Sequence, residues 1–408
     1  MEIIFPRCCG LDVHKLSVMA CAVTPEGRET RTFGSMTKEL LQLKQWLHEL
    51  GVTHVAMEST GVYWKPIYNI LEDNFTLLVV NARHLKAVPG RKTDVKDAEW
   101  IADLLRHGLL RGSYIPDRLH RELKEVVRYR RVLIREQSRI ISRIQKILEG
   151  ANIKLSSVAS DVVGVSGRII LQAMINGIED PKELAAMAKG KLRKKMQSLE
   201  DALQGQMGSH QRRLLESELD HLDFLDRKII KLDVDIAQRL QPYEHMLEQI
   251  DTVHGIGRRA AEEILVEIGP DVVSRFSNAH HLASWAKVCP GNNESAGKRR
   301  SGRTGHGNPW LRSVLVEAAW GAVRVKDGYF AGFYHRLAGR RGKKRAIVAV
   351  AHCILVTIYS MLKHNTCYQD LGVCFHDLIN PQRVIRRAID RIERLGYKVT
   401  VDALAPSS

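Results

Sequence analysis

Four acidic side chains stand where this sequence could carry out metal-dependent chemistry: Asp12, Glu58, Asp94 and Asp97. Asp12 lies in an apolar run and Glu58 directly follows another, so each is expected at the end of a strand. Asp94 and Asp97 are three positions apart, which places both on one face of the helix that Thr93 would cap. Carboxylates that converge repel one another and stay ionised together only if divalent cations lie between them.

The chemistry of such a site would be phosphodiester cleavage or transfer. Hard oxygen ligands favour Mg²⁺ or Mn²⁺, and a pair of such ions clamps the attacking and leaving oxygens of a phosphodiester. Taken singly, each acid is more simply a turn residue or a favourable charge at a helix start. The order strand, hairpin, strand, strand, helix with acids at these points is what a ribonuclease-H-like fold needs, so the set as a whole favours a metal site.

The elements that must position these acids form an α/β domain in residues 1–112. A hairpin is expected around the turn Thr-Pro-Glu-Gly, and Met36 to Leu50 has the apolar periodicity of an amphipathic helix. The expected strands are Cys8 to Val13, Val18 to Val23, Arg28 to Phe33, His54 to Met57 and Thr76 to Val80. The helix from Asp94 keeps an apolar stripe, which anchors the two acids of its first turn.

Residues 113–244 change to a seven-residue apolar repeat. Apolar pairs recur between Asp117 and Gly150, and Leu215, Leu222, Ile229 and Ile236 repeat the pattern. These two long helices are expected to form coiled coils, paired either with each other or with another subunit, which makes a dimer or a larger oligomer the expected assembly.

Charge indicates a polyanionic partner. The chain of 408 residues has a net charge of +16 and a pI of about 9.6. Between Asp117 and Gly150 there are ten Lys or Arg residues against four Glu, which indicates either a solvated helix face or a nucleic-acid contact. The candidate contacts on this helix are Arg128, Arg131 and Arg135.

A second candidate site lies in residues 245–378, an expected helical domain. Gly255-Ile256-Gly257 has the spacing of a helix-hairpin-helix turn, whose amides can face a phosphate, although a tight turn without a ligand explains it equally well. Residues 289–312 are rich in Gly and Arg, and their candidate phosphate contacts are Lys298, Arg299, Arg300, Arg303 and Arg312. Ser295 or Ser301 could attack phosphorus beside these cations, or either could simply form a turn.

The remaining composition excludes several classes. The seven cysteines show no Cys-x-x-Cys spacing, which argues against a zinc site or disulfide framework and favours a reducing cytoplasm. No secretory leader is expected at the N-terminus. Ala346 to Leu362 is at the lower length limit for a membrane span and carries polar residues, so a buried core helix is the expected structure, with no membrane partner.

Several motifs together resemble one family. They are Gly-Leu-Asp-Val-His-Lys, Met-Glu-Ser-Thr-Gly-Val-Tyr-Trp, Lys-Thr-Asp-Val-Lys-Asp-Ala, the Gly-Ile-Gly turn, and Glu-Ser-Ala-Gly through Gly-Asn-Pro-Trp-Leu-Arg. Over nearly its whole length the chain resembles the IS-one-ten (IS110) family of bacterial insertion-sequence transposases, relatives of the pilin-inverting recombinase.

The resemblance implies a RuvC-like N-terminal domain whose Asp-Glu-Asp-Asp metal site is Asp12, Glu58, Asp94 and Asp97. It also implies a nucleophilic serine at Ser295, where Ala296 replaces the Gly that usually follows. The implied reaction is DNA recombination guided by a structured RNA that the element itself encodes. Serine attacks a DNA phosphate to leave a covalent phosphoserine, and the metal-bearing domain completes a composite site between subunits. A dimer that assembles to a tetramer at the bacterial nucleoid, in the cytoplasm, is the expected form.

The predicted architecture is therefore α/β plus all-α. A RuvC-like domain (1–112) precedes a helical coiled-coil domain (113–244), a serine-bearing domain (245–378) and an accessory tail (379–408). The leading hypothesis is a magnesium- or manganese-dependent DNA transposase. One alternative is a Holliday-junction-type endonuclease in which metal-activated water cuts and Ser295 only holds a phosphate. Another is a protein that binds nucleic acid without catalysis.

Overall fold

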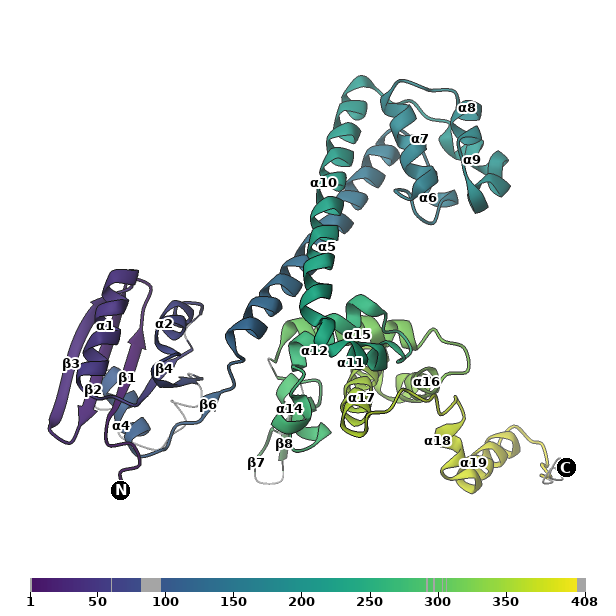
Figure 1. The fold of residues 1–408 in the computed structure, drawn as a ribbon. Helices are drawn as coiled ribbons and strands as arrows, with labels where there is room; N and C mark the ends of the chain where they lie inside the picture. Colours follow the sequence, from purple (N-terminus) through teal and green to yellow (C-terminus); the bar gives the residue numbers. More distant parts are fainter. Residues whose placement is uncertain are drawn as a thin grey trace. The chain divides into compact units, whose positions relative to one another are not determined.

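A computed structural model describes residues 2–59, 61–81, 97–290, 293–295, 298–302, 304–305 and 307–401. The chain divides into two compact units, Met1–Arg121 and Glu122–Ser408 (Figure 1). The first contains a mixed sheet with helices and the second is predominantly helical, in agreement with the predicted combination of α/β and all-α structure.

The sheet of the first unit has the order β3-β2-β1-β4-β5-β6. β1 pairs antiparallel with β2 and parallel with β4, β4 pairs parallel with β5, and the short β6 closes the edge antiparallel to β5. The strands are β1 (Cys8–Val13), β2 (Ser17–Thr24), β3 (Gly27–Gly34), β4 (His54–Glu58), β5 (Thr76–Val80) and β6 (Gly112–Ser113). This mixed order is compatible with a ribonuclease-H-like domain.

The two faces of the sheet follow from the alternation of side chains along β1. Cys9, Leu11 and Val13 share a core with α1 (Thr37–Glu49) and α2 (Trp64–Leu71). Cys8 is on the opposite face, where it shares a core with residues of α4 (Asp97–Arg106). In Figure 1, α1 covers one face of the sheet and α4 lies on the other.

Gly10 lets α4 lie directly on β1. A Cβ added at Gly10 would be 2.3 Å from the backbone oxygen of Ala98 and 2.4 Å from the backbone nitrogen of Ala102. No side chain larger than hydrogen fits at this crossing, so the close packing of helix on strand depends on glycine.

The two long helices of the second unit pair with each other. α5 (Arg118–Gly150) and α10 (Ser209–Leu240) run antiparallel in Figure 1. Arg130 pairs with Asp233, Gln137 with Asp226, and Arg143 with Glu218, so partners move forward on one helix as they move back on the other. Of the two sequence-based alternatives, pairing within the chain is the one that the structure shows; a further contact with another subunit stays a prediction.

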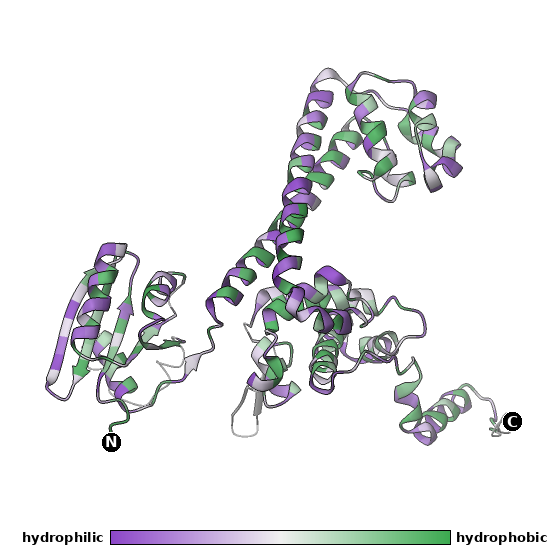
Figure 2. Ribbon diagram, viewed as in Figure 1, coloured by the Kyte–Doolittle hydropathy of each residue, from purple (hydrophilic) through white to green (hydrophobic). Residues whose placement is uncertain are grey.

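The apolar residues of the heptad repeat lie between these helices. Ile140 and Ile144 of α5 share one core with Leu222 and Ile229 of α10, and all four are buried. Four short helices extend this core near the end of the hairpin: α6 (Leu155–Val158), α7 (Val165–Ile175), α8 (Pro181–Ala186) and α9 (Met196–Leu203). The purple and green stripes of α5 and α10 in Figure 2 show this amphipathic pattern.

A further group of helices shares one apolar core with α17 (Lys343–His364). They are α11 (Glu244–Asp251), α12 (Arg258–Ile268), α13 (Val272–Arg275), α14 (Ala279–Ala286), α15 (Pro309–Ala322) and α16 (Tyr329–Arg341). Within the described residues, α17 is the one helix long and apolar enough to cross a membrane. It packs instead at the centre of this group, with Val350, Ile354 and Ile358 fully buried, as expected for a core helix. The chain then continues into α18 (Phe375–Leu378) and α19 (Pro381–Glu393).

Candidate functional site

Asp12 and Glu58 lie beside each other at the carboxyl ends of β1 and β4. The strands pair in parallel register through Leu11 and Met57, so the next residue on each strand is an acid. Side chains alternate along a strand, which puts Asp12 on the face of Gly10 and Glu58 on the face of Ala56, the face that α4 covers. The register therefore brings two of the predicted carboxylates to one end and one face of the sheet.

Asp97 approaches the same end of the sheet from α4. It is the first residue of this helix, and the following Ala98 lies over Gly10, two residues before Asp12. The Cys8 thiol contacts the Ala102 carbonyl oxygen at 3.7 Å, so α4 runs in the direction opposite to β1. Its N-terminus consequently points toward the carboxyl end of β1. Asp94 lies outside the described residues.

Asp12 contacts a histidine two positions later in the chain, to which the sequence motif gave no role. The Asp12 carboxylate lies 3.0 Å from Nε2 of His14, and the His14 side chain is well exposed. The signal in the sequence was the i, i+2 spacing, because such residues share one face of an extended segment. Glu58 and Asp97 also have interaction partners.

The three described acids offer the right donor chemistry for a metal ion without forming a closed ligand cluster. Carboxylate oxygens are the ligands that Mg²⁺ and Mn²⁺ prefer. Within the part of the chain that the structure describes, no three His, Cys, Asp or Glu side chains are close enough to bind an ion together. The fold does bring Asp12, Glu58 and Asp97 to the same end and the same face of the sheet.

The predicted nucleophile lies in a small two-stranded sheet of the second unit. β7 (Asn293–Ser295) pairs antiparallel with β8 (Lys298–Ser301), with Ser295 opposite Lys298 and Asn293 opposite Ser301. Of the predicted phosphate contacts, Lys298, Arg299 and Arg300 belong to β8, Arg303 lies outside the described residues, and Arg312 is half-buried on α15. The hairpin register thus places basic residues along the strand facing Ser295.

The arginines of α5 that were candidates for nucleic-acid contact have protein partners. Arg131 is buried and pairs with Glu263 of α12 and Glu317 of α15. Arg128 donates two hydrogen bonds to Glu267, at 2.6 and 2.9 Å. These two side chains therefore connect helices, whereas the sequence had left open a solvated face or a nucleic-acid contact. A nucleic-acid contact by Arg128 and Arg131 stays a prediction. The ion pairs make such a contact less favourable, because each arginine would have to leave its glutamate partner.

Three buried glutamates of α12 are the residues that sequence reasoning missed: Glu262, Glu263 and Glu267. Arg130, which is 1% exposed, pairs with Glu262 at 2.6 Å and with Asp233 at 3.0 Å. Burial raises the pKa of Glu263, and the charge of Arg131 offsets only part of that effect. The available signal in the sequence was the presence of acidic residues on a helix with many apolar positions. If such a helix is buried, its carboxylates need cationic partners, because an unpaired buried carboxylate is very costly.

The Gly255 turn has a packing explanation. Gly255 has φ +83°, and a Cβ there would be 2.2 Å from the Ala318 carbonyl oxygen of α15. By contrast, nothing lies within 4 Å of a Cβ at Gly257. The first glycine therefore supports the interpretation as a tight helix-helix turn.

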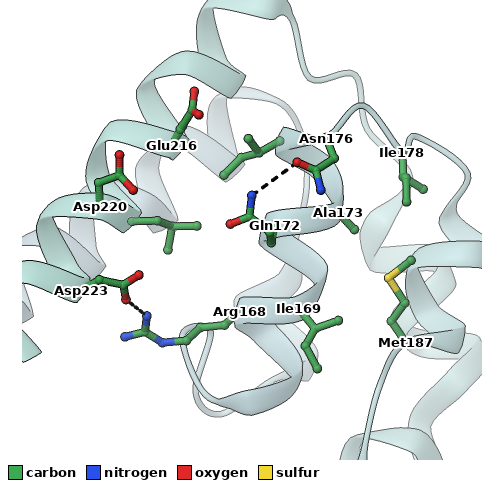
Figure 3. A pocket seen from close by; sticks show the side chains of 12 residues that line it. Arg168, Ile169, Gln172, Ala173, Asn176, Ile178, Met187, Glu216, Asp220 and Asp223 are labelled. Atoms are coloured by element: carbon green, nitrogen blue, oxygen red, sulfur yellow. Dashed lines mark hydrogen bonds and ion pairs between the residues drawn. The ribbon is translucent and has the colours of Figure 1, made fainter.

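A groove of about 580 Å³ lies elsewhere, between α7 and α10 (Figure 3). It is lined by Arg168 and Gln172 of α7 and by Glu216, Asp220 and Asp223 of α10. Arg168 pairs with Asp223 and hydrogen bonds to the Val163 carbonyl oxygen at 3.0 Å, which ties α7 to the hairpin. The groove contains none of the predicted site residues.

Two comparisons with protein families match the chain at the segments that carry these sites. A family model for the DEDD domain of IS110 elements, described as Transposase, matches residues 9–153 and so includes β1, β4 and α4. A second, described as Transposase IS116/IS110/IS902 family, matches residues 247–335 and includes the β7-β8 hairpin. No curated protein matched the chain. The class is therefore a transposase, an enzyme that acts on DNA in transposition.

The chain belongs to the IS110 family of transposases. Enzymes with this type of DEDD domain generally use divalent metals, which agrees with the donor chemistry of Asp12, Glu58 and Asp97. DNA is consequently a partner.

Proposed function

We propose that this transposase transfers DNA strands through a serine nucleophile and a divalent-metal carboxylate site, guided by a structured RNA. The observation that carries the metal part is the shared position of Asp12, Glu58 and Asp97 at one end and one face of the sheet. Family membership supports the recombination part. The RNA guide rests on the resemblance in sequence alone.

The carboxylates would hold Mg²⁺ or Mn²⁺ in a ribonuclease-H-like domain, residues 1–112, with Asp94 as a fourth ligand. The bound ions would supply electrostatic stabilisation of the charge that develops on the phosphate. His14 can hydrogen bond to Asp12 and hold that carboxylate in one orientation.

Ser295 would carry the covalent step in a serine-bearing domain, residues 245–378. Its hydroxyl oxygen attacks phosphorus, a new phosphoserine ester forms, and one deoxyribose oxygen leaves as a hydroxyl after accepting a proton. The hydroxyl of a second DNA end then attacks the phosphoserine and releases the serine. The basic residues of β8 favour such a reaction, because cations stabilise a phosphoryl group as charge accumulates on it.

The two sites would act together in an oligomer. The helical segment 113–244 is the proposed connection, residues 379–408 form an accessory tail, and a dimer that assembles to a tetramer would supply composite sites. Such an enzyme would work at the bacterial nucleoid in the cytoplasm. The RNA part is tested by purifying the protein from cells that carry the element and sequencing the RNA that copurifies; ribosomal fragments alone would contradict it.

The nucleophile is tested by trapping its ester. Wild-type protein and Ser301→Ala are expected to form a covalent adduct with end-labelled DNA on a denaturing gel, whereas Ser295→Ala forms none. A Ser295→Ala protein that still cuts DNA at the full rate would leave a metal-dependent endonuclease as the better proposal. The carboxylate positions favour that second function equally, since metal-activated water needs the same ligands.

A further inference from the structure

Glu267 lies at a junction between three helices. It is the penultimate residue of α12 and is 3% exposed. Its carboxylate accepts two hydrogen bonds from Arg128 of α5, at 2.6 and 2.9 Å, and lies 3.6 Å from the ammonium group of Lys124. This geometry is a bidentate arginine–carboxylate pair, which fixes orientation as well as distance.

The third helix joins through Asn308. The side-chain oxygen of Asn308 accepts from the backbone amides of Trp310 and Leu311, at 3.0 and 3.2 Å, and so caps the N-terminus of α15. Its side-chain nitrogen donates to Glu267 at 2.5 Å. One amide group thus closes the start of α15 and attaches that start to the carboxylate.

Trp310 reinforces the same attachment. Its ring has the guanidinium carbon of Arg128 5.6 Å from its centroid and that of Arg135 at 5.5 Å. Cation–π contacts of this kind add to the hydrogen bonds of the junction. Asn308 and Trp310 of the sequence motif are therefore accounted for by contacts with α12 and α5.

The ionisation of Glu267 is compatible with this role. Burial alone would raise its pKa, but hydrogen bonds from Arg128 and the charge of Lys124 hold the pKa below the ordinary glutamate value. The group is consequently a carboxylate at neutral pH and remains an acceptor for Asn308.

Asn308 is also the residue at which the serine-bearing segment enters α15. β7 and β8 precede it, and Ser295 lies thirteen positions before it in the sequence. β8 ends at Ser301, seven positions before Asn308, so the connection that follows the strand pair ends at a fixed residue. A short connection with a fixed end leaves the strand pair fewer accessible orientations than one that ends in a free loop.

We propose that Glu267 is a positioning residue. Through its hydrogen bond with Asn308, it fixes the start of α15 to α5 and α12, and the start of α15 is where the segment that carries the serine hairpin ends. The expected effect of Glu267 on catalysis rests on the proposed function of Ser295. The expected effect of Glu267 on the conformational order of the β7-β8 hairpin does not depend on that function.

The discriminating variant is Asn308→Asp. Aspartate caps a helix as well as asparagine does, so α15 keeps its start, while the carboxylate now faces Glu267 and repels it. Glu263→Gln is the matched control, because it removes another buried ion pair of α12 that does not contact Asn308.

Two measurements separate positioning from stability in full-length protein. Cleavage of bound DNA in a single turnover should slow about 10-fold or more in Asn308→Asp, with DNA affinity within about 3-fold of wild type, because small misplacements of reacting groups are costly. Backbone amides of β7 and β8 should exchange hydrogen about 10-fold faster in Asn308→Asp and at the wild-type rate in Glu263→Gln.

Two outcomes would overturn the inference: wild-type cleavage and exchange rates in Asn308→Asp, or an equal loss in Glu263→Gln at equal thermal stability. If wild-type protein forms no serine adduct, the proposed nucleophile fails. The exchange rates of the hairpin amides then still decide whether Glu267 positions it.

Discussion

Replacing Gly10 by alanine should separate the acids of the candidate metal site without changing any of them. A Cβ at this position would be 2.3 Å from the Ala98 oxygen and 2.4 Å from the Ala102 nitrogen, and both are backbone atoms that cannot rotate away. Since ordinary Cβ contacts begin at 3.4 Å, α4 must move by about 1 Å away from β1. Asp97 moves with α4, whereas Asp12 and Glu58 stay with the sheet.

The displacement sets the size of both expected effects. A shift of about 1 Å in a catalytic group costs on the order of 100-fold in rate. Overpacking of a tight core contact costs about 1–3 kcal/mol of unfolding free energy. Gly10→Ala is therefore expected to fold and to bind DNA, but to cut it about 100-fold more slowly.

The assay is cleavage of labelled DNA in a single turnover with Mg²⁺, alongside urea denaturation. Gly112→Ala is the matched control, because it adds a methyl group to β6 of the same sheet at an ordinary 3.5 Å contact with Leu78. It should leave the cleavage rate within about 2-fold of wild type. Wild-type cleavage by Gly10→Ala would refute the reasoning that α4 brings Asp97 to the acids of the sheet.

Three further perturbations test other parts of the structure. Asp12→Asn should lower strand transfer by about 100-fold or more, with unfolding free energy changed by less than about 1 kcal/mol because its partner His14 is exposed; a retained rate on a transposition assay would contradict this. Leu222→Ala should lower the free energy of unfolding in urea by about 2–5 kcal/mol, since Leu222 is fully buried between α5 and α10. The control Leu214→Ala, at an exposed position, should lower it by less than about 0.5 kcal/mol, and equal losses would argue against an apolar core between the two helices. Burial alone would raise the pKa of Glu267, but hydrogen bonds from Arg128 and the charge of Lys124 hold it below the ordinary glutamate value, so its stabilising contribution is present above the unfolded pKa and is lost as the pH falls through the lower folded pKa. The stability gap between wild type and Glu267→Gln should therefore narrow as the solution is acidified, and a constant gap in acid denaturation curves would contradict the ionised pair.

Much of the first unit could be predicted from the sequence because its signals are local. β1, β4 and β5 are short apolar runs between turns, and the structure places them within a residue or so of the expected ranges. The acids at their ends follow directly, since a residue at the end of a run is at the end of a strand. The structure adds the parallel register that puts Asp12 beside Glu58.

The second unit shows why a charge pattern on one helix is ambiguous. Ten basic residues against four acidic ones between Asp117 and Gly150 indicated either a solvated helix face or a nucleic-acid contact. Arg128, Arg130 and Arg131 each pair with a glutamate of α12 more than 130 residues later in the chain. No local rule predicts pairs between residues so far apart in the sequence, because these pairs form only when α5 packs against α12.

By itself, the sequence determined strands β1 to β5, the two amphipathic heptad helices, the apolar helix that becomes α17 and the residue types of the candidate sites. These depend on periodicity, turn chemistry and side-chain type within a few residues of each other. Only the tertiary structure decided that α5 pairs with α10, that Gly10 admits α4 onto the sheet, and that Glu267 ties Asn308 to Arg128. Those contacts join residues far apart in the chain, and their energies depend on burial and orientation, which exist only after the helices have packed.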